Sequence, residues 1–507
     1  MKKQLKRLLC CLTLCAVLTG GLTVPAAAAG FADVPANHWA AESIQRCVKL
    51  GFFQGQSASR FGLGQKMTRS AFTVVLCRFF GWEATTPAKA TYQDVSTDAW
   101  YAGAVEAAYG HGALTDQRDH FRPNDPITRE ELAVMLVRAL GYGTIAGLAQ
   151  DLSMPFWDVT TNTGYITMAY DLGLVNGTTE DTFSPDRAAT REQVAVILMR
   201  LYDKLHQTGP GQIAVASAAG DFTGLEAVAV PVGRLITVNG KPMVNTTMDQ
   251  KETASILKAA QQADAKKLLY LTGGPSALTG GPSALNGKAI GTAGTVAAEV
   301  SAGGYDGVLL EVPALSTKKS GAMTDLVKAL DTALGDKLLY VMAEAPSRTG
   351  KTYGYEYKAL AAAADRLVLR ITPYAAFSGG FPTAPVDPLE EIYYALGSLC
   401  DSIDSSKLAL MVTTGVSAWS GQEKYSLTPE KYETLLADPK TGFHYSNRYA
   451  CAYLTGTAGS SKKEVVVWYL DRQAAATRLQ LARAFGVGQL CLDDWSSASQ
   501  DLLSGLR

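Results

Sequence analysis

The chain has 507 residues and a formal net charge of -1, and only 18% of its residues are charged. This near-neutral composition argues against a nucleic-acid-binding protein and against a polybasic membrane protein. The length exceeds what one core encloses, and 47% apolar residues provide enough material for about two to four domains.

Residues 1–29 have the layout of a secretory signal peptide. A basic start precedes an apolar stretch from Leu8 to Val24, and the small residues Ala26–Ala29 follow. Such a segment is cleaved on export. An uncleaved membrane anchor is the alternative, but the apolar stretch is short and is interrupted by two glycines. After cleavage we expect no transmembrane span.

Cysteine and histidine usage argues against a metal site. Cys10, Cys11 and Cys15 leave with the signal peptide, and the remaining cysteines are scattered without a CxxC spacing. The five histidines do not cluster. We therefore expect buried free thiols, no metal and no cofactor.

A motif recurs three times in the first half of the chain. Each copy opens with an aromatic residue and an Asp, continues into a helical stretch ending at a glycine, and reaches a Thr-Arg step. The copies span residues 30–84, 90–143 and 151–203. Thr128-x-x-Glu131 and Thr190-x-x-Gln193 are capping boxes, which predict helix starts. One helix–loop–helix unit of about 60 residues cannot enclose a core, so the three copies should pack together.

These residues resemble the S-layer homology repeat, a family that forms a three-pronged helical assembly. The resemblance implies binding to secondary cell-wall polysaccharide, commonly with pyruvylated ends, and a secreted protein at the cell wall or S-layer surface. An arginine fork suits a ketal carboxylate, and aromatic rings suit sugar faces. The implied binding residues are Asp33, Trp39, Arg69, Asp94, Trp100, Arg129, Asp158 and Arg191. Alternatively, these Asp and Arg residues only fix helix ends.

The second half alternates short apolar runs with helical stretches. Residues 204–224 lose the helical pattern and predict a linker, and residues 225–507 predict a (β/α)8 TIM barrel. An open doubly wound sheet is the alternative, but no GxGxxG or P-loop motif favours it. The pattern fixes the first strand only within residues 213–231. The predicted strands are Ala227–Pro231, Lys267–Leu271, Gly307–Val312, Leu338–Ala343, Leu367–Ile371, Leu408–Thr413, Val465–Tyr469 and Gly488–Leu492.

Four segments of this half resemble glycoside hydrolase family 18, the chitinase family. They are Leu271–Gly274, Gly304–Pro313, Lys407–Trp419 and Val467–Gly488. The family hydrolyses N-acetylglucosamine-containing glycan with assistance from the substrate, and a Glu at a strand end acts as general acid. Pro313 occupies that position here, and Glu311 lies about 6–7 Å deeper along the strand. We therefore expect a degenerate barrel.

The sequence thus predicts a wall-anchored binding protein whose family-18-like barrel binds a glycan without hydrolysing it. One alternative is an active glycosidase on peptidoglycan or chitin, in which Glu311 would have to replace the acid. Another is a purely architectural S-layer component. The candidate residues at the barrel mouth are Glu311, Glu344, Arg370, Tyr374, Trp419, Asp493, Asp494 and Trp495. Rim salt bridges and packing are alternative roles for these side chains.

Overall fold

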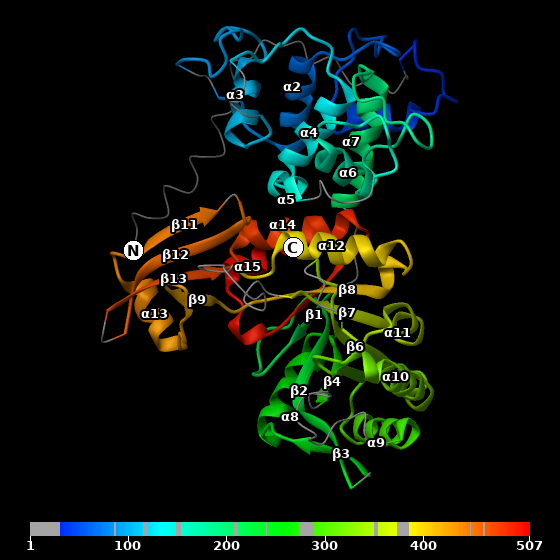
Figure 1. The fold of residues 1–507 in the computed structure, drawn as a ribbon, viewed down its shortest axis with the longest axis vertical. Helices are drawn as coiled ribbons and strands as arrows, with labels where there is room; N and C mark the ends of the chain where they lie inside the picture. The colour runs from blue at the N-terminus through cyan, green and yellow to red at the C-terminus, as the bar shows by residue number, and fades with distance from the viewer. Residues whose placement is uncertain are drawn as a thin grey trace, which may run out of the picture.

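The computed structural model describes residues 31–85, 88–114, 119–148, 154–206, 211–239, 241–273, 288–348, 353–372, 385–446, 448–459 and 462–506. These residues form a helical unit, a closed barrel and an antiparallel sheet beside the barrel (Figure 1). The predicted combination of a helical repeat unit and a barrel is confirmed. The predicted signal peptide and Tyr374 lie outside the described residues.

The helical unit consists of three repeats in contact with one another. Its helices are α1 (Ala41–Lys49), α2 (Arg69–Phe80), α3 (Ala102–Gly110), α4 (Arg129–Ala139), α5 (Gly143–Leu148), α6 (Thr163–Asp171) and α7 (Arg191–Leu205). Thr128 and Glu131 form the predicted capping box at the start of α4. At the start of α7 the amide of Thr190 donates to the side chain of Gln193. The helices α2, α4 and α7 therefore all begin at a Thr-Arg step.

A cyclic set of backbone hydrogen bonds joins the repeats just before these three helices. The amide of Met67 donates to the carbonyl of Ala189, Ala189 donates to Ile127, and Ile127 donates to Met67, at 2.8–2.9 Å. All three residues are buried. Because buried backbone groups must be paired, each repeat needs both of its neighbours. This closure explains why the three repeats share one core.

Eight parallel strands close into the barrel, because β1 pairs with β14 on one side and with β2 on the other. In order around the cylinder they are β1 (Gln212–Val215), β14 (Gln489–Leu492), β8 (Leu408–Val412), β7 (Arg366–Arg370), β6 (Leu338–Glu344), β5 (Gly307–Glu311), β4 (Lys266–Gly273) and β2 (Leu225–Val238). Outside the cylinder, β3 (Lys241–Thr246) runs antiparallel to β2. The accompanying helices are α8 (Gln250–Gln262), α9 (Ala289–Ala302), α10 (Ser320–Leu334), α11 (Tyr357–Ala363), α12 (Leu389–Cys400), α14 (Arg472–Ala484) and α15 (Gln500–Ser504).

The barrel interior is a packed core. Alternate residues of the strands point inward, and buried side chains such as Ile213, Leu268, Leu309, Val368 and Met411 contact one another there. The other faces of the strands contribute to a larger core shared with the helices. The carboxyl ends of the strands therefore form a mouth above a solid floor.

Two strand assignments differ from the sequence prediction. The first barrel strand, β1, lies inside the segment predicted as a linker, and residues 216–224 connect it to β2 without a helix. The run Val465–Tyr469 is a strand, but it belongs to the antiparallel sheet and not to the barrel. A short apolar run fits either kind of sheet, so periodicity could not separate them.

The antiparallel sheet is inserted between β8 and α14, in the strand order β10-β9-β13-β12-β11. Its elements are β9 (Ser417–Ser420), β10 (Glu423–Lys424), α13 (Pro429–Ala437), β11 (Gly442–Ser446), β12 (Cys451–Ala458) and β13 (Lys463–Tyr469). Figure 1 shows this insertion to one side of the barrel.

The cysteines outside the predicted signal peptide are free thiols, as predicted, and all but Cys400 are buried. Among the described residues, no group of three or more His, Cys, Asp or Glu side chains is arranged to hold a metal ion. Within the same residues, every helix is too short or too polar to cross a membrane.

The helical unit packs directly on the barrel, where α7 meets α14 (Figure 1). Lys204 donates from Nζ to the carbonyl of Ala484, the last residue of α14, at 2.6 Å. Arg483 donates in return to the last carbonyl of α7, at 3.3 Å. Tyr393 of α12 donates to Asp171 at the end of α6, at 2.6 Å. The two units are thus held in direct contact and are not joined by a linker alone.

Replacing Lys204 with Ala should weaken this junction. The variant removes the cation from the C-terminal carbonyls of α14, an interaction that contributes about 1–2 kcal/mol in partly buried geometries. Thermal unfolding would measure the loss. Arg200→Ala is the matched control, because Arg200 is exposed on the same helix and has no side-chain hydrogen bond within the described residues. Equal unfolding temperatures for both variants would contradict the assignment.

Candidate functional site

The arginine of each Thr-Arg step reaches into the next repeat. Its Nε donates to the carbonyl of a phenylalanine at 2.8–2.9 Å, and its guanidinium lies over the ring of the same residue, 4.4–5.1 Å from the centroid. The pairs are Arg69 with Phe121, Arg129 with Phe183 and Arg191 with Phe61. Because the last pair joins the third repeat to the first, the three contacts form a closed ring.

The motif aspartates hold the same phenylalanines from within their own repeats. Asp94 accepts from the amides of Phe121 and the next residue, and Asp158 accepts likewise from Phe183, at 2.7–2.8 Å. Asp33 accepts from three consecutive amides that begin at Phe61. Burial acts to raise the pKa of Asp33, but these amides together hold it below its ordinary value. The aspartates therefore shape the loops that the arginines contact.

A carboxylate neutralises the first of the three arginines. Nη1 of Arg69 lies 3.0 Å from Glu131, which also pairs with Arg122. Burial acts to raise the pKa of Glu131, but Arg69, the Thr128 amide and Arg122 together hold it below its ordinary value. Arg69 is thus part of a three-residue ion-pair cluster between the first and second repeats.

The other two arginines have no such partner in the part of the chain that the structure describes. Arg129 also donates from Nη2 to Asn176, and Arg191 to Gln54, and both acceptors are backbone carbonyls. Their Nη1 atoms make no hydrogen bond within the described residues. Burial lowers the pKa of both guanidinium groups. An external anion would therefore meet an unpaired cation at each of these two positions.

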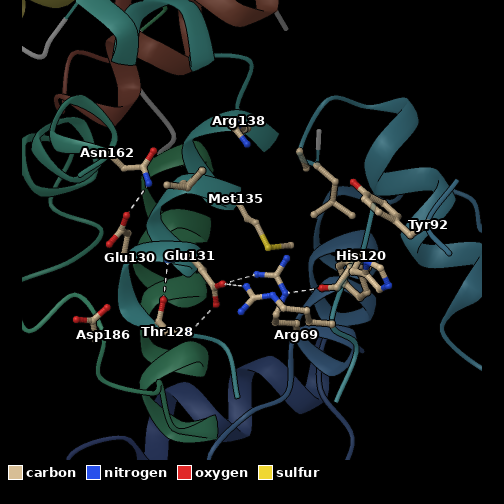
Figure 2. A pocket seen from close by; sticks show the side chains of 15 residues that line it. Arg69, Tyr92, His120, Thr128, Glu130, Glu131, Met135, Arg138, Asn162 and Asp186 are labelled. Carbon is tan, nitrogen blue, oxygen red and sulfur yellow. Dashed lines mark hydrogen bonds and ion pairs between the residues drawn. The ribbon is translucent and has the colours of Figure 1, made fainter. Parts of the chain in front are cut away.

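A pocket of about 380 Å³, here called the repeat groove, opens beside Arg69 (Figure 2). Figure 2 shows Glu130 and Asn162 on one side and Tyr92 and His120 on the other. The charged side chains that line it are Arg69, Arg122, Arg138, Glu130, Glu131 and Asp186. Positive and negative groups balance, so the groove offers hydrogen-bond donors and acceptors without a strong net charge.

Three tryptophans of the helical unit are exposed. Trp39 is 62% exposed, Trp100 is 70% exposed and Trp157 is 73% exposed. Sequence reasoning missed Trp157 because it precedes its motif aspartate, whereas the other two follow theirs. Tyr165 is nearest to the expected tryptophan position in the third repeat, but Arg138 covers its ring at 5.0 Å.

Glu311 ends β5 inside the barrel mouth and is only 6% exposed. Arg370, the last residue of β7, pairs with it at 2.8 Å. The hydroxyl of Tyr270 donates to the other carboxylate oxygen. Burial, reinforced by the charge of Glu311, raises the pKa of Tyr270, so the tyrosine keeps its proton. Glu311 is thus a buried acceptor that both Arg370 and Tyr270 hold in place.

The next strand end holds a second carboxylate that is also engaged. Glu344 ends β6 and accepts from the amide of Ala314 at 2.7 Å and from the hydroxyl of Tyr355. Ala314 follows Pro313 and has a positive φ of 51°, which is uncommon for a residue with a side chain. Glu344 therefore fixes the turn that carries Pro313.

The remaining predicted mouth residues divide between β14 and the inserted sheet. Asp493 follows β14 and accepts from the amide and the hydroxyl of Thr414, both at 2.8 Å. Asp494 caps the turn after it by accepting from Ser496. Trp495 packs against the ring of Phe222 at 5.9 Å. Trp419 is 7% exposed in β9 and has no free face for a sugar, because the inserted sheet buries it.

Sequence reasoning missed Asp387, a buried carboxylate beside Asp493. It accepts from the amide and hydroxyl of Thr413, at 2.7 and 2.8 Å, while Thr414 holds Asp493. Burial raises the pKa of Asp387 despite the nearby Arg478. Its φ is 43°, in the left-handed region. It lies in a predicted loop, far in sequence from its partners, so no local signal could identify it.

The family model for the S-layer homology domain matches residues 30–73, 91–133 and 155–195. The chain carries three S-layer homology repeats. An endoglucanase from a Bacillus species is 32% identical over 40% of this chain, and an S-layer protein from Bacillus thuringiensis subsp. finitimus is 29% identical over 41%. The chain spans 23% and 25% of the length of these relatives. The repeats and the S-layer relatives identify a secreted protein associated with the cell wall or S-layer surface.

Solved structures with a similar fold include a chitinase from Chromobacterium violaceum, at 15% identity and a TM-score of 0.47, covering 58% of this chain and 98% of that one. The spore cortex-lytic enzyme SleL from Bacillus megaterium has 14% identity and a TM-score of 0.47, covering 68% of this chain and 80% of that one.

Replacing Glu131 with Gln tests the ion-pair cluster through its pH dependence. The folded-state pKa of Glu131 lies below its ordinary value of 4.5. Its charge therefore stabilises the fold above pH 4.5, and this contribution disappears as the pH falls through the lower folded-state value. At pH 7 the variant should lose roughly 1–3 kcal/mol of unfolding free energy, and the loss should shrink below pH 4.5.

Urea unfolding at several pH values would measure the effect of Glu131→Gln. Glu180→Gln is the control, because Glu180 is exposed and has no side-chain hydrogen bond within the described residues. A loss that is independent of pH would show that the charge of Glu131 is not what matters.

Proposed function

We propose that the three repeats anchor the protein by binding secondary cell-wall polysaccharide, and that the barrel is displayed as a non-catalytic glycan-binding domain. The anchoring half rests on the repeats themselves together with the unpaired donors of Arg129 and Arg191. The relatives do not decide the role of the barrel, because their names include both an endoglucanase and an S-layer protein.

The three arginines differ in whether a carboxylate pairs with them, which suggests that they bind different parts of the polysaccharide. Arg129 and Arg191 lack a carboxylate partner within the described residues, so each suits an acidic substituent such as a ketal carboxylate. Arg69 is already neutralised by Glu131, so its groove suits uncharged sugar residues. The exposed faces of Trp39, Trp100 and Trp157 are available for stacking on sugar rings.

Arg129→Ala and Arg191→Ala should weaken binding to pyruvylated wall polysaccharide by at least about tenfold each, which corresponds to losing one charge-assisted hydrogen bond. Arg200→Ala is the control, because Arg200 is exposed on α7 and does not line the repeat groove. Calorimetric titration with purified polysaccharide would give the affinities, and thermal unfolding would report the structural loss. Binding losses that are fully accounted for by the loss of folded protein in thermal unfolding would make Arg129 and Arg191 purely structural.

The engagement of every predicted carboxylate at the barrel mouth supports the non-catalytic assignment. A general acid needs a proton and access to the leaving oxygen. Pro313 has no proton to donate, and Glu311 is buried in an ion pair with Arg370. Glu344 accepts from the turn that carries Pro313, and Asp493 is tied to Thr414. These three carboxylates of the mouth therefore all have partners among the described residues.

One observation favours the second candidate function, an active glycosidase on N-acetylglucosamine-containing glycan such as peptidoglycan or chitin. Asp387 and Asp493 are held by the adjacent residues Thr413 and Thr414, at the carboxyl end of β8. Burial raises the pKa of Asp387, which favours the protonated form. A pair of carboxyl groups in which one is held protonated is a usual acid–base arrangement.

Hydrolysis assays on N-acetylglucosamine oligomers and peptidoglycan separate these functions. We expect no turnover by the full chain, by Glu311→Gln or by Asp387→Asn, with all three folded by circular dichroism. Turnover that Asp387→Asn abolishes and Glu311→Gln preserves would establish the glycosidase with a relocated acid. Turnover lost in Glu311→Gln would instead identify Glu311 as the acid.

A further inference from the structure

A second cleft, of about 730 Å³, lies where the helical unit meets the barrel and is here called the junction cleft. The helical unit lines it with Trp82, Tyr109 and His111, and the inserted sheet contributes Tyr445. Phe80, Trp82 and His111 stack nearly parallel, with centroids 5.0 and 4.5 Å apart. One wall of the cleft is thus a rigid stack of rings.

The helix α14 forms the opposite wall. Gln473, Ala476, Thr477 and Gln480 line the cleft, and their spacing of three and four residues puts them on one face of the helix. Arg478 and other residues of α14 are buried in the barrel. The side-chain amides of Gln473 and Gln480 make no hydrogen bond within the described residues, so they are available to a ligand.

The lining of the junction cleft suits uncharged sugar residues. None of its described lining residues is a carboxylate, and its one permanently charged side chain is Arg138. Amides and hydroxyls both donate and accept, as sugar hydroxyls require. Aromatic rings offer apolar surface to the C–H faces of a pyranose. The volume lies in the range of small-molecule binding sites.

The junction cleft adjoins the repeat groove, because Arg138 and Leu114 line both. We propose that one polysaccharide chain runs from the repeat groove past Arg138 into the junction cleft, so that α14 of the barrel is part of the anchoring site. This inference rests on the proposed binding of wall polysaccharide by the repeats. The contact of Lys204 with the end of α14 holds the two walls together.

The test uses the full chain and purified wall polysaccharide at two lengths, the native polymer and fragments of a single repeating unit. Gln473→Ala combined with Gln480→Ala should bind the polymer about tenfold more weakly than the native chain, because two hydrogen-bonding side chains are lost. Single units fill only one subsite, so their binding should be unchanged. Gln261→Ala combined with Gln262→Ala, on the exposed end of α8, is the matched control and should bind as the native chain does.

Failure of the junction-cleft proposal can be distinguished from failure of the proposed anchoring function. Native polymer affinity in the Gln473/Gln480 variant, with binding still lost in Arg129→Ala, would overturn the junction cleft and leave the anchoring function intact. An equal loss of affinity for single repeating units would show that one polysaccharide chain does not run through both the repeat groove and the junction cleft. If the native protein does not bind the polymer, the proposed function and this inference both fail.

Discussion

The ring of arginine–phenylalanine contacts is the interaction on which the helical unit depends. Each phenylalanine is held twice, by the aspartate of its own repeat at the amide and by the arginine of the preceding repeat at the carbonyl and ring. Hydrogen bonds to a charged partner are stronger than neutral ones, and here both the donor and the acceptor roles of one loop are used. In this structure each arginine contacts the next repeat and not its own, so each repeat depends on its neighbours. The same geometry leaves the Nη1 atoms of Arg129 and Arg191 without a hydrogen bond to any described residue.

At the barrel mouth, the predicted charged side chains have charged or hydrogen-bonding partners. The predicted carboxylates there are paired with other groups of the protein. Glu311 is the clearest case, because it pairs with Arg370 of β7 and accepts a hydrogen bond from Tyr270 of β4. Removing one member of such a buried pair is costly because the other charge is left unpaired. Each predicted carboxylate of the mouth thus has a partner among the described residues.

Features with a signal in the sequence could be predicted, whereas contacts between residues far apart in the sequence could not. The Thr128–Glu131 capping box could be predicted because its partners lie a few residues apart, and the three-repeat unit could be predicted because its motif recurs along the chain. The pairing of Glu311 with Arg370 could not, since a closed barrel brings distant strand ends together without a local pattern. The strand β1 was missed because it lies in a segment interrupted by glycines, and Trp419 was assigned to the mouth because it follows a predicted barrel strand, whereas it lies in the inserted sheet. Whether Arg69 binds a ligand or a loop likewise depends on the neighbouring repeat, because Phe121 belongs to the second repeat.

Ring closure also orders the folding of the chain. The contact between Arg191 and the carbonyl of Phe61 spans 130 residues, and the central backbone bonds cannot close before the third repeat arrives. Closing so large a loop is slow because its entropy is lost before the contact forms. A chain that emerges N-terminus first therefore cannot complete its first repeat early. The first repeat can form its internal contacts alone, but its bonds to the third repeat form last.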